Sequence, residues 1–187
     1  MNKIGSNANA AGHPVLFGFA PALTFVAHPD GGGYPIGFVE KAYATLNVRD
    51  PQRVLHLCSG SMRQGVRIDV RASMRPSVVA DCRKTPFASE SFRWIMADPP
   101  YAETYAEQLY DTKTRYPKPG EILTEAARLL IPGGRFGILH FLVPHARHGL
   151  RLVGVWGVST GCGYAIRAWS VFEKPHASLP LDESEAE

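Results

Sequence analysis

The sequence has few of the features that disulfide-bonded, zinc-binding or membrane-spanning proteins need. It contains three cysteines, Cys58, Cys82 and Cys162, and none belongs to a Cys-x-x-Cys pair. This argues against a disulfide framework and a zinc site, and it predicts a reducing, cytoplasmic setting. No apolar run approaches the roughly 20 residues that a transmembrane helix needs, and the first residues lack a basic start before an apolar stretch. We therefore expect no metal and no membrane association.

Charge is distributed unevenly along the chain. The 20 Lys and Arg exceed the 17 Asp and Glu by a net +3, yet Asp182, Glu183, Glu185 and Glu187 all lie at the very end. The rest of the chain is therefore more basic than the total suggests, which is compatible with a polyanionic partner without establishing one. We predict a flexible leader over residues 1–12, one folded domain over 13–174 and a disordered acidic tail over 175–187.

Short apolar and β-branched runs alternate with amphipathic helical patterns. The predicted strands are Leu23 to Ala27, Arg53 to Cys58, Val66 to Val70, Ser77 to Ala80, Phe92 to Ala97, Arg135 to Phe141, Leu150 to Gly157 and Ala165 to Phe172. The predicted helices are Ile36 to Leu46 and Glu121 to Leu130, the second ended by Pro132-Gly133-Gly134. This alternation predicts an α/β fold on a mostly parallel sheet.

Two connections are unusually short for such a fold. Only residues 59–65 separate the strand that ends at Cys58 from the one that starts at Val66, and the next connection, from Val70 to Ser77, is equally short. A parallel crossover normally needs about a dozen residues or more. Either the helices after these two strands are missing, which would leave a sheet face bare for a second copy or a partner subunit, or the strand assignments are wrong.

The stretch from Val78 to Tyr101 reads VVADCRKTPFASESFRWIMADPPY. It resembles the third and fourth motifs of class I S-adenosylmethionine-dependent methyltransferases, in the group that methylates exocyclic amines of nucleobases. The resemblance covers roughly residues 28 to 172. It implies a Rossmann-like, mostly parallel twisted sheet with a C-terminal antiparallel hairpin, and S-adenosylmethionine as the cofactor.

By this resemblance, Asp98, Pro99, Pro100 and Tyr101 form the catalytic centre. The lone pair of an adenine amino nitrogen is delocalised into the ring, so the Asp98 carboxylate and the Pro99 carbonyl would accept its two N–H bonds and direct that lone pair at the methyl group. Two prolines hold the carbonyl outward because neither can donate to a strand ladder, and Tyr101 would stack on the flipped base. The alternative is a plain strand-ending turn.

The resemblance also implies a set of cofactor-binding residues. The first motif of the family aligns with Ser59-Gly60, with His56 where an acid is common, and a His-Pro segment before the first helix resembles the tenth motif. Asp69 would bind the ribose and Asp81 the adenine, although Asp69 could instead be a solvated surface carboxylate. The full set is His28, Pro29, Tyr34, Pro35, His56, Cys58, Ser59, Gly60, Asp69, Asp81 and Cys82.

Tyrosines and basic residues follow the Asp-Pro-Pro-Tyr motif. Their mixture suits a loop that stacks bases and contacts phosphates, although a solvated helix and loop with inward tyrosines would look the same. These candidate substrate-binding residues are Tyr105, Tyr110, Lys113, Arg115, Tyr116 and Lys118. His140, in an apolar run, is interpreted as a core or near-core histidine rather than a base.

The resemblance implies methyl transfer to N6 of adenine in DNA, directly and without a covalent intermediate. The C5-cytosine enzymes need a cysteine nucleophile, displayed after a proline in that family, and none of the three cysteines follows proline. RNA adenine, N4 of cytosine and, less readily, a protein glutamine amide remain alternatives. So does a catalytically inactive nucleic-acid-binding or assembly subunit with a degenerate cofactor loop.

Overall fold

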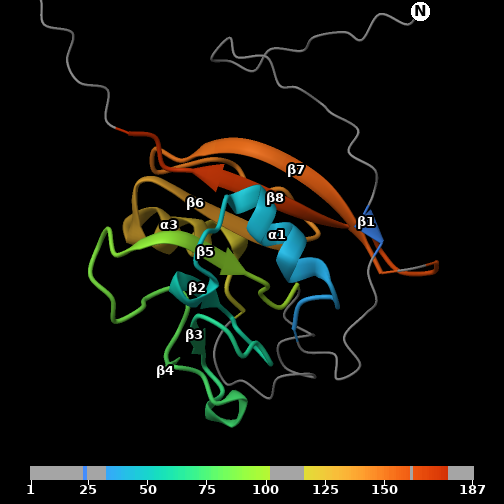
Figure 1. Cartoon of the computed structure of the whole chain (residues 1–187), viewed down its shortest axis with the longest axis horizontal. Helices are drawn as coiled ribbons and strands as arrows, with labels where there is room; N and C mark the ends of the chain where they lie inside the picture. The colour runs from blue at the N-terminus through green and yellow to red at the C-terminus, as the bar shows by residue number, and fades with distance from the viewer. Residues whose placement is uncertain (1–22, 25–32, 102–115, 161, 177–187) are drawn as a thin grey trace, which may run out of the picture.

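The computed structural model describes residues 23–24, 33–101, 116–160 and 162–176, and within them one sheet dominates (Figure 1). Its eight strands lie in the order β1-β7-β8-β6-β5-β2-β3-β4. The strands are β1 (Leu23–Thr24), β2 (Val54–Leu57), β3 (Val66–Asp69), β4 (Val78–Val79), β5 (Phe92–Ala97), β6 (Leu130–His140), β7 (Arg151–Ser159) and β8 (Arg167–Glu173). The helices are α1 (Phe38–Leu46) and α3 (Pro119–Leu129), with short 3-10 turns at η1 (Pro51–Arg53) and η2 (Ala72–Met74). Each predicted strand segment overlaps one of these strands, although β6, β7 and β8 extend beyond their predicted segments.

Strand directions confirm the predicted architecture. The neighbours β4, β3, β2, β5 and β6 are all parallel, whereas β8 runs antiparallel to both β6 and β7. The sheet is thus mostly parallel with a C-terminal antiparallel hairpin. Because the strands are parallel, the carboxyl ends of β2, β3 and β5 meet at one edge of the sheet, where Leu57 pairs with both Ile68 and Ala97.

The two short connections contain no α-helix. Residues 58–65, between β2 and β3, are turns and bends, and the β3–β4 connection holds only η2. The strand assignments were therefore right and the two helices are missing. Such a short crossover is feasible because β2 and β3 have four residues each, or roughly 13 Å, which a loop of eight residues can span in extended form.

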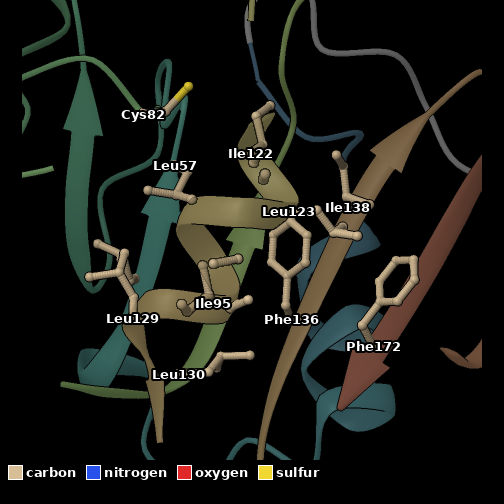
Figure 2. Packing of buried hydrophobic residues seen from close by; sticks show 14 of the residues in the cluster. Leu57, Cys82, Ile95, Ile122, Leu123, Leu129, Leu130, Phe136, Ile138 and Phe172 are labelled. Atoms are coloured by element: carbon tan, nitrogen blue, oxygen red, sulfur yellow. The ribbon is translucent and has the colours of Figure 1, made fainter. Parts of the chain in front are cut away.

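The two helices cover opposite faces of the sheet (Figure 1). Behind the sheet, α3 buries Ile122, Leu123 and Leu129 against strand residues that include Ile95 and Phe136 (Figure 2). In front, α1 buries Phe38, Ala42 and Leu46 in a second cluster, in which the Phe38 ring meets the edge of Trp169 at a centroid distance of 5.1 Å. The apolar spacing within each helix explains this one-sided burial.

The predicted end of the second helix at Leu130 was right to one residue, but the predicted start of the next strand at Arg135 was wrong. Helix α3 ends at Leu129, and the Pro-Gly-Gly segment lies inside β6 rather than terminating the helix. Gly133 has a φ of 75° and its N–H donates to the Lys174 carbonyl at 2.7 Å. A Cβ on Gly134 would lie 3.0 Å from the Arg93 carbonyl oxygen. The two glycines therefore allow an irregular strand beside the register shift in β5.

Exposed apolar side chains lie mainly away from the missing helices. Within the described residues, Val79 is the one large exposed hydrophobic residue on β2, β3 or β4. Others lie on β7, namely Leu152, Val153 and Val155, and in the loop after β6. No helix in the described part of the chain is both long and apolar enough to cross a membrane.

Candidate active site

Asp98 and Tyr101 lie where β5 ends, at the edge shared with the carboxyl ends of β2 and β3. The Tyr101 hydroxyl donates to Asp98 Oδ1 at 2.5 Å. Arg167, the first residue of β8, donates from Nη1 to the Tyr101 hydroxyl at 2.7 Å. Because β8 is antiparallel to β6, its first residue lies at the same edge as the end of β5. The result is a hydrogen-bonded chain from Arg167 through Tyr101 to Asp98.

Burial sets the ionisation of this chain. It raises the pKa of Asp98 to about 6, an effect limited by the hydrogen bond from Tyr101 and by the charge of Arg167. Burial, with the Asp98 charge next, also raises the pKa of Tyr101. At neutral pH Asp98 is therefore mostly a carboxylate and Tyr101 a neutral donor. A carboxylate poised near pH 6 in a polar edge of the sheet is a feature often found at functional sites.

The Tyr101 ring is held by three neighbours. Its centroid lies 4.6 Å from that of Phe141 and 5.6 Å from that of His140. The guanidinium carbon of Arg167 lies 5.7 Å from the same centroid, within cation–π range. In this conformation the Tyr101 hydroxyl is hydrogen-bonded to Asp98 Oδ1. The predicted chemistry needs the Asp98 carboxylate to accept a hydrogen bond from a substrate amine instead.

Tyr116 and His140 stabilise the turn that contains Tyr101. The Leu142 N–H donates to His140 Nδ1 at 3.0 Å, so His140 Nε2 carries the proton and donates to the Tyr116 hydroxyl at 3.0 Å. That hydroxyl in turn donates to the Tyr101 carbonyl at 3.3 Å. Burial lowers the pKa of His140, which keeps it neutral. This confirms that His140 is a buried histidine, and its role here is to position Tyr101.

Asp69 organises the loop that follows β2. Its Oδ2 accepts from the Gly60 N–H at 2.9 Å, and the backbone N–H and guanidinium of Arg71 supply three further hydrogen bonds to its two oxygens. Asp69 is only 5% exposed, so the alternative of a solvated surface carboxylate was wrong. Four donors fill about all the lone-pair positions of a carboxylate. Asp69 could therefore accept a hydrogen bond from a ribose hydroxyl only if one of its hydrogen bonds from Arg71 were broken.

Asp81 has a similar clamp but is more open. Arg83 donates to it from the backbone at 2.9 Å and from the guanidinium at 2.5 to 3.0 Å, while the Asp81 side chain stays 32% exposed. Next to it, the Cys82 thiol is hydrogen-bonded to that of Cys58, which together with burial raises the pKa of Cys58. Both thiols are free. The ends of β2 and β4 thus meet at the predicted cofactor site.

Three buried polar atoms near the end of β2 have no hydrogen-bond partner among the described residues. They are Tyr34 Oη, His56 Nδ1 and Ser59 Oγ. Burial raises the pKa of Tyr34 and the nearby Asp98 charge raises it further, which places this hydroxyl close to the catalytic candidate. Buried polar groups are normally paired. The hydroxyls of Tyr34 and Ser59 are therefore available to hydrogen-bond another group at this edge.

His56 is fixed as a neutral side chain. Tyr43 donates its hydroxyl proton to Gln64 Oε1 at 3.3 Å, so His56 Nε2 carries a proton and donates to the same hydroxyl at 3.3 Å. Burial, with the Arg67 charge next, lowers the pKa of His56 to about 4. At the position where the family motif commonly has an acid, this chain therefore has a neutral imidazole, which packs toward α1.

Some predicted residues lie outside the described part of the chain, or apart from the site. His28, Pro29, Tyr105, Tyr110, Lys113 and Arg115 are outside the described residues. Pro35 is buried and its carbonyl accepts from the Phe38 N–H at the start of α1, and Lys118 is exposed at the N-cap of α3. Within the described residues, no cluster of three His, Cys, Asp or Glu is placed to hold a metal.

Sequence reasoning read Arg71 and Arg83 only as part of a basic run, and it missed their pairing with Asp69 and Asp81 as well as the role of Arg167. The first two each follow an acid by two residues, a spacing that a turn can close, and this was the available signal. Arg167 is 66 residues from Tyr101, and no local pattern links them.

Comparison with known proteins gives matches in structure only. The sequence matches no protein-family profile and no curated protein. TrmN from Thermus thermophilus is 21% identical with a TM-score of 0.50, over 72% of this chain and 47% of TrmN, so the chain spans less than half of TrmN. A methyltransferase in complex with the Haloferax volcanii Trm112 methyltransferase activator is 16% identical with a TM-score of 0.52, over 75% and 90% of the two chains. The [4+2]-cyclase SpnF is 12% identical with a TM-score of 0.50, over 84% and 88%.

These likenesses show the Rossmann-like fold of class I methyltransferases. At such low sequence identity they do not show the reaction or the substrate of this chain. Because the cyclase has this fold as well, the fold does not determine the reaction, and function has to be argued from the site.

Proposed function

We propose that this protein transfers a methyl group from S-adenosylmethionine to the exocyclic amine of a nucleobase, with N6 of adenine in DNA as the preferred target. The observation that carries the proposal is the Asp98-Pro99 step. It combines a part-buried carboxylate of pKa about 6 with an adjacent proline carbonyl, directly beside the loop after β2. The net positive charge of +3 is compatible with a polyanionic substrate.

The residues around the loop after β2 fit the cofactor. The hydroxyls of Ser59 and Tyr34 are buried and unpaired within the described residues, so each can bond a polar group of a ligand. Gly60, with a φ of 50°, permits close approach of the backbone. Asp81 keeps exposed carboxylate surface for an adenine amine. When bound there, the cofactor supplies an electrophilic methyl group on a sulfonium.

At Asp98 the substrate amine takes the place of the Tyr101 hydroxyl. The carboxylate and the Pro99 carbonyl then accept the two N–H bonds, and the nitrogen lone pair turns toward the methyl group. The released Tyr101 ring is available to stack on the base, while Arg167 balances the Asp98 charge. The proton leaves to water after transfer. No base is required, in keeping with the neutral, hydrogen-bonded His140.

The inactive-subunit alternative is favoured by specific contacts. Asp69 is saturated by Gly60 and Arg71, Asp98 is covered by Tyr101, and His56 stands where the family motif has an acid. A protein that no longer binds the cofactor could keep all of these. RNA adenine and N4 of cytosine, in contrast, would use the same chemistry at Asp98 and differ only in the base.

Two variants separate cofactor binding from chemistry. Calorimetric titration with S-adenosylmethionine and a methyl-transfer assay on DNA should be applied to the wild type, Asp98→Ala and Asp81→Ala. We expect Asp98→Ala to abolish transfer with cofactor affinity within a few-fold of wild type, and Asp81→Ala to weaken cofactor binding first. Asp50→Ala, which removes only an exposed cap of η1, is the matched control and should change neither.

Two results would count against the proposal. Near-normal turnover by Asp98→Ala would remove Asp98 from the mechanism. Absence of binding heat for the wild type at tens of micromolar protein would favour the subunit function.

A further inference from the structure

A cavity of about 480 Å³ lies at the end of the sheet opposite to Asp98. Its lining includes Asn47 and Arg49 after α1, Arg93 and Trp94 from the start of β5, Arg135 of β6 and Glu173 of β8. Strand β5 leads from this cavity to the candidate active site, and Trp94 and Asp98 are four residues apart along it, or roughly 13 Å. The volume falls in the range of small-molecule sites. The cavity is therefore separate from the candidate active site.

The charges in this cavity do not balance. Three arginines face one acid, and Glu173 is already occupied because it accepts from Arg135 Nε at 3.0 Å and from Arg151 Nη2 at 3.1 Å. Arg135 is also fixed by donating to the Thr45 carbonyl at 3.1 Å. The side chains of Arg49 and Arg93, by contrast, have no hydrogen bond or ion pair with any described residue. Each guanidinium carries five N–H donors and no acceptor. We therefore expect the cavity to bind an anion.

One wall of the cavity is apolar. Trp94 lines the cavity beside the guanidiniums of Arg49 and Arg93 and is 9% exposed, whereas Leu46 also lines the cavity but has no exposed surface. A planar ring can pack on such a wall, whereas a bare inorganic anion would not use it. Guanidinium groups bind phosphate in a bidentate manner and stack on planar groups.

We propose that this cavity binds one nucleotide unit, with its phosphate on Arg49 and Arg93 and its base against Trp94. The unit could be a free mononucleotide or a nucleotide within a strand. The inference stands without the proposed methyl transfer, because the two sites share no residue.

The test uses uridine 5′-monophosphate, which lacks the adenine that the cofactor site would bind. Calorimetric titration should show binding to the wild type, and an Arg49→Gln/Arg93→Gln double variant should bind about tenfold more weakly or worse, as expected for losing hydrogen bonds to charged groups. Uridine and inorganic phosphate, tested separately, should each bind more weakly than the nucleotide. Arg147→Gln is the matched control, since Arg147 is an exposed arginine near the start of α3 and does not line this cavity.

Three results would overturn the inference: no binding of the nucleotide, equal binding by the double variant, or inorganic phosphate binding as tightly as the nucleotide. Both substituted arginines are exposed, so the variant should keep the wild-type melting temperature. Titration with oligothymidylate separates the two sources. If the oligonucleotide binds the double variant more weakly than the wild type, the cavity binds a nucleotide within a strand. If its affinity is the same for both proteins, the cavity binds the free nucleotide. An unchanged titration with S-adenosylmethionine would show that the proposed function is unaffected.

Discussion

Asp98→Asn should make the protein more stable at neutral pH while removing methyl transfer. Burial raises the pKa of Asp98 from 3.8 to about 6, so the folded protein binds this proton more tightly than the unfolded chain does. Below about pH 4 the carboxyl is protonated in both states and has no cost. Between pH 4 and 6 Asp98 ionises in the unfolded chain but not in the folded protein, so the free energy of unfolding falls. Above pH 6 the carboxyl is ionised in both states, and this loss stays constant. Folding stability attributable to Asp98 is thus lost as pH rises through the folded pKa.

The magnitude follows from the same shift. A difference of about two pKa units corresponds to at most about 3 kcal/mol at pH 7, less where the part-exposed carboxylate is solvated. Urea unfolding of wild type and Asp98→Asn at several values from pH 4 to 8 measures the difference directly. We expect it to grow in favour of the variant up to about pH 6 and then level off, whereas Glu40→Gln, an exposed acid in the first turn of α1, should show a flat difference. A flat difference for Asp98→Asn as well would refute the argument that its carboxylate is held at a cost.

Other perturbations test the neighbouring contacts. Arg167→Met removes a charge that lowers the pKa of Asp98, so the acid limb of the pH–rate profile should move to higher pH, and an unchanged midpoint would contradict the hydrogen-bonded chain. Arg71→Gln leaves the buried Asp69 short of partners and should cost about 2 kcal/mol or more in urea unfolding. Arg83→Gln, next to the more exposed Asp81, should cost under about 1 kcal/mol, and equal losses would argue against the difference in burial. Glu125→Gln weakens a buried group that accepts from Thr85 and Arg128, with an expected loss of about 2–3 kcal/mol; a variant as stable as wild type would show that these bonds contribute little.

Much of the fold could be predicted from the sequence because strand periodicity and the two amphipathic helices are local features. The short connection after β2 was also visible as a count of residues, and the structure resolved its two interpretations in favour of missing helices. The start of β6 at Leu130 could not be predicted. Pro132-Gly133-Gly134 is typical of a helix stop, but the Lys174 carbonyl and the neighbouring β5 strand draw this segment into β6. Such a choice depends on residues distant in the sequence.

The site was predictable to a lesser extent. The position of Asp98 at the end of a strand followed from the motif, and its adjacency to the end of β2 followed from a parallel sheet. The occupation of its oxygen by Tyr101, the support from Arg167 and the saturation of Asp69 did not, because each depends on tertiary geometry. The roles of the cofactor and substrate residues remain predictions.

The central proposal is tested most directly by identifying the methylated nucleoside. DNA is incubated with the protein and S-adenosylmethionine that carries a deuterated methyl group, digested to nucleosides and analysed by mass spectrometry. We expect deuterated N6-methyladenine with the wild type and none with Asp98→Ala. Labelled N4-methylcytosine would keep the mechanism and change the base, whereas label only at C5 of cytosine, or no label with DNA or RNA, would contradict the account.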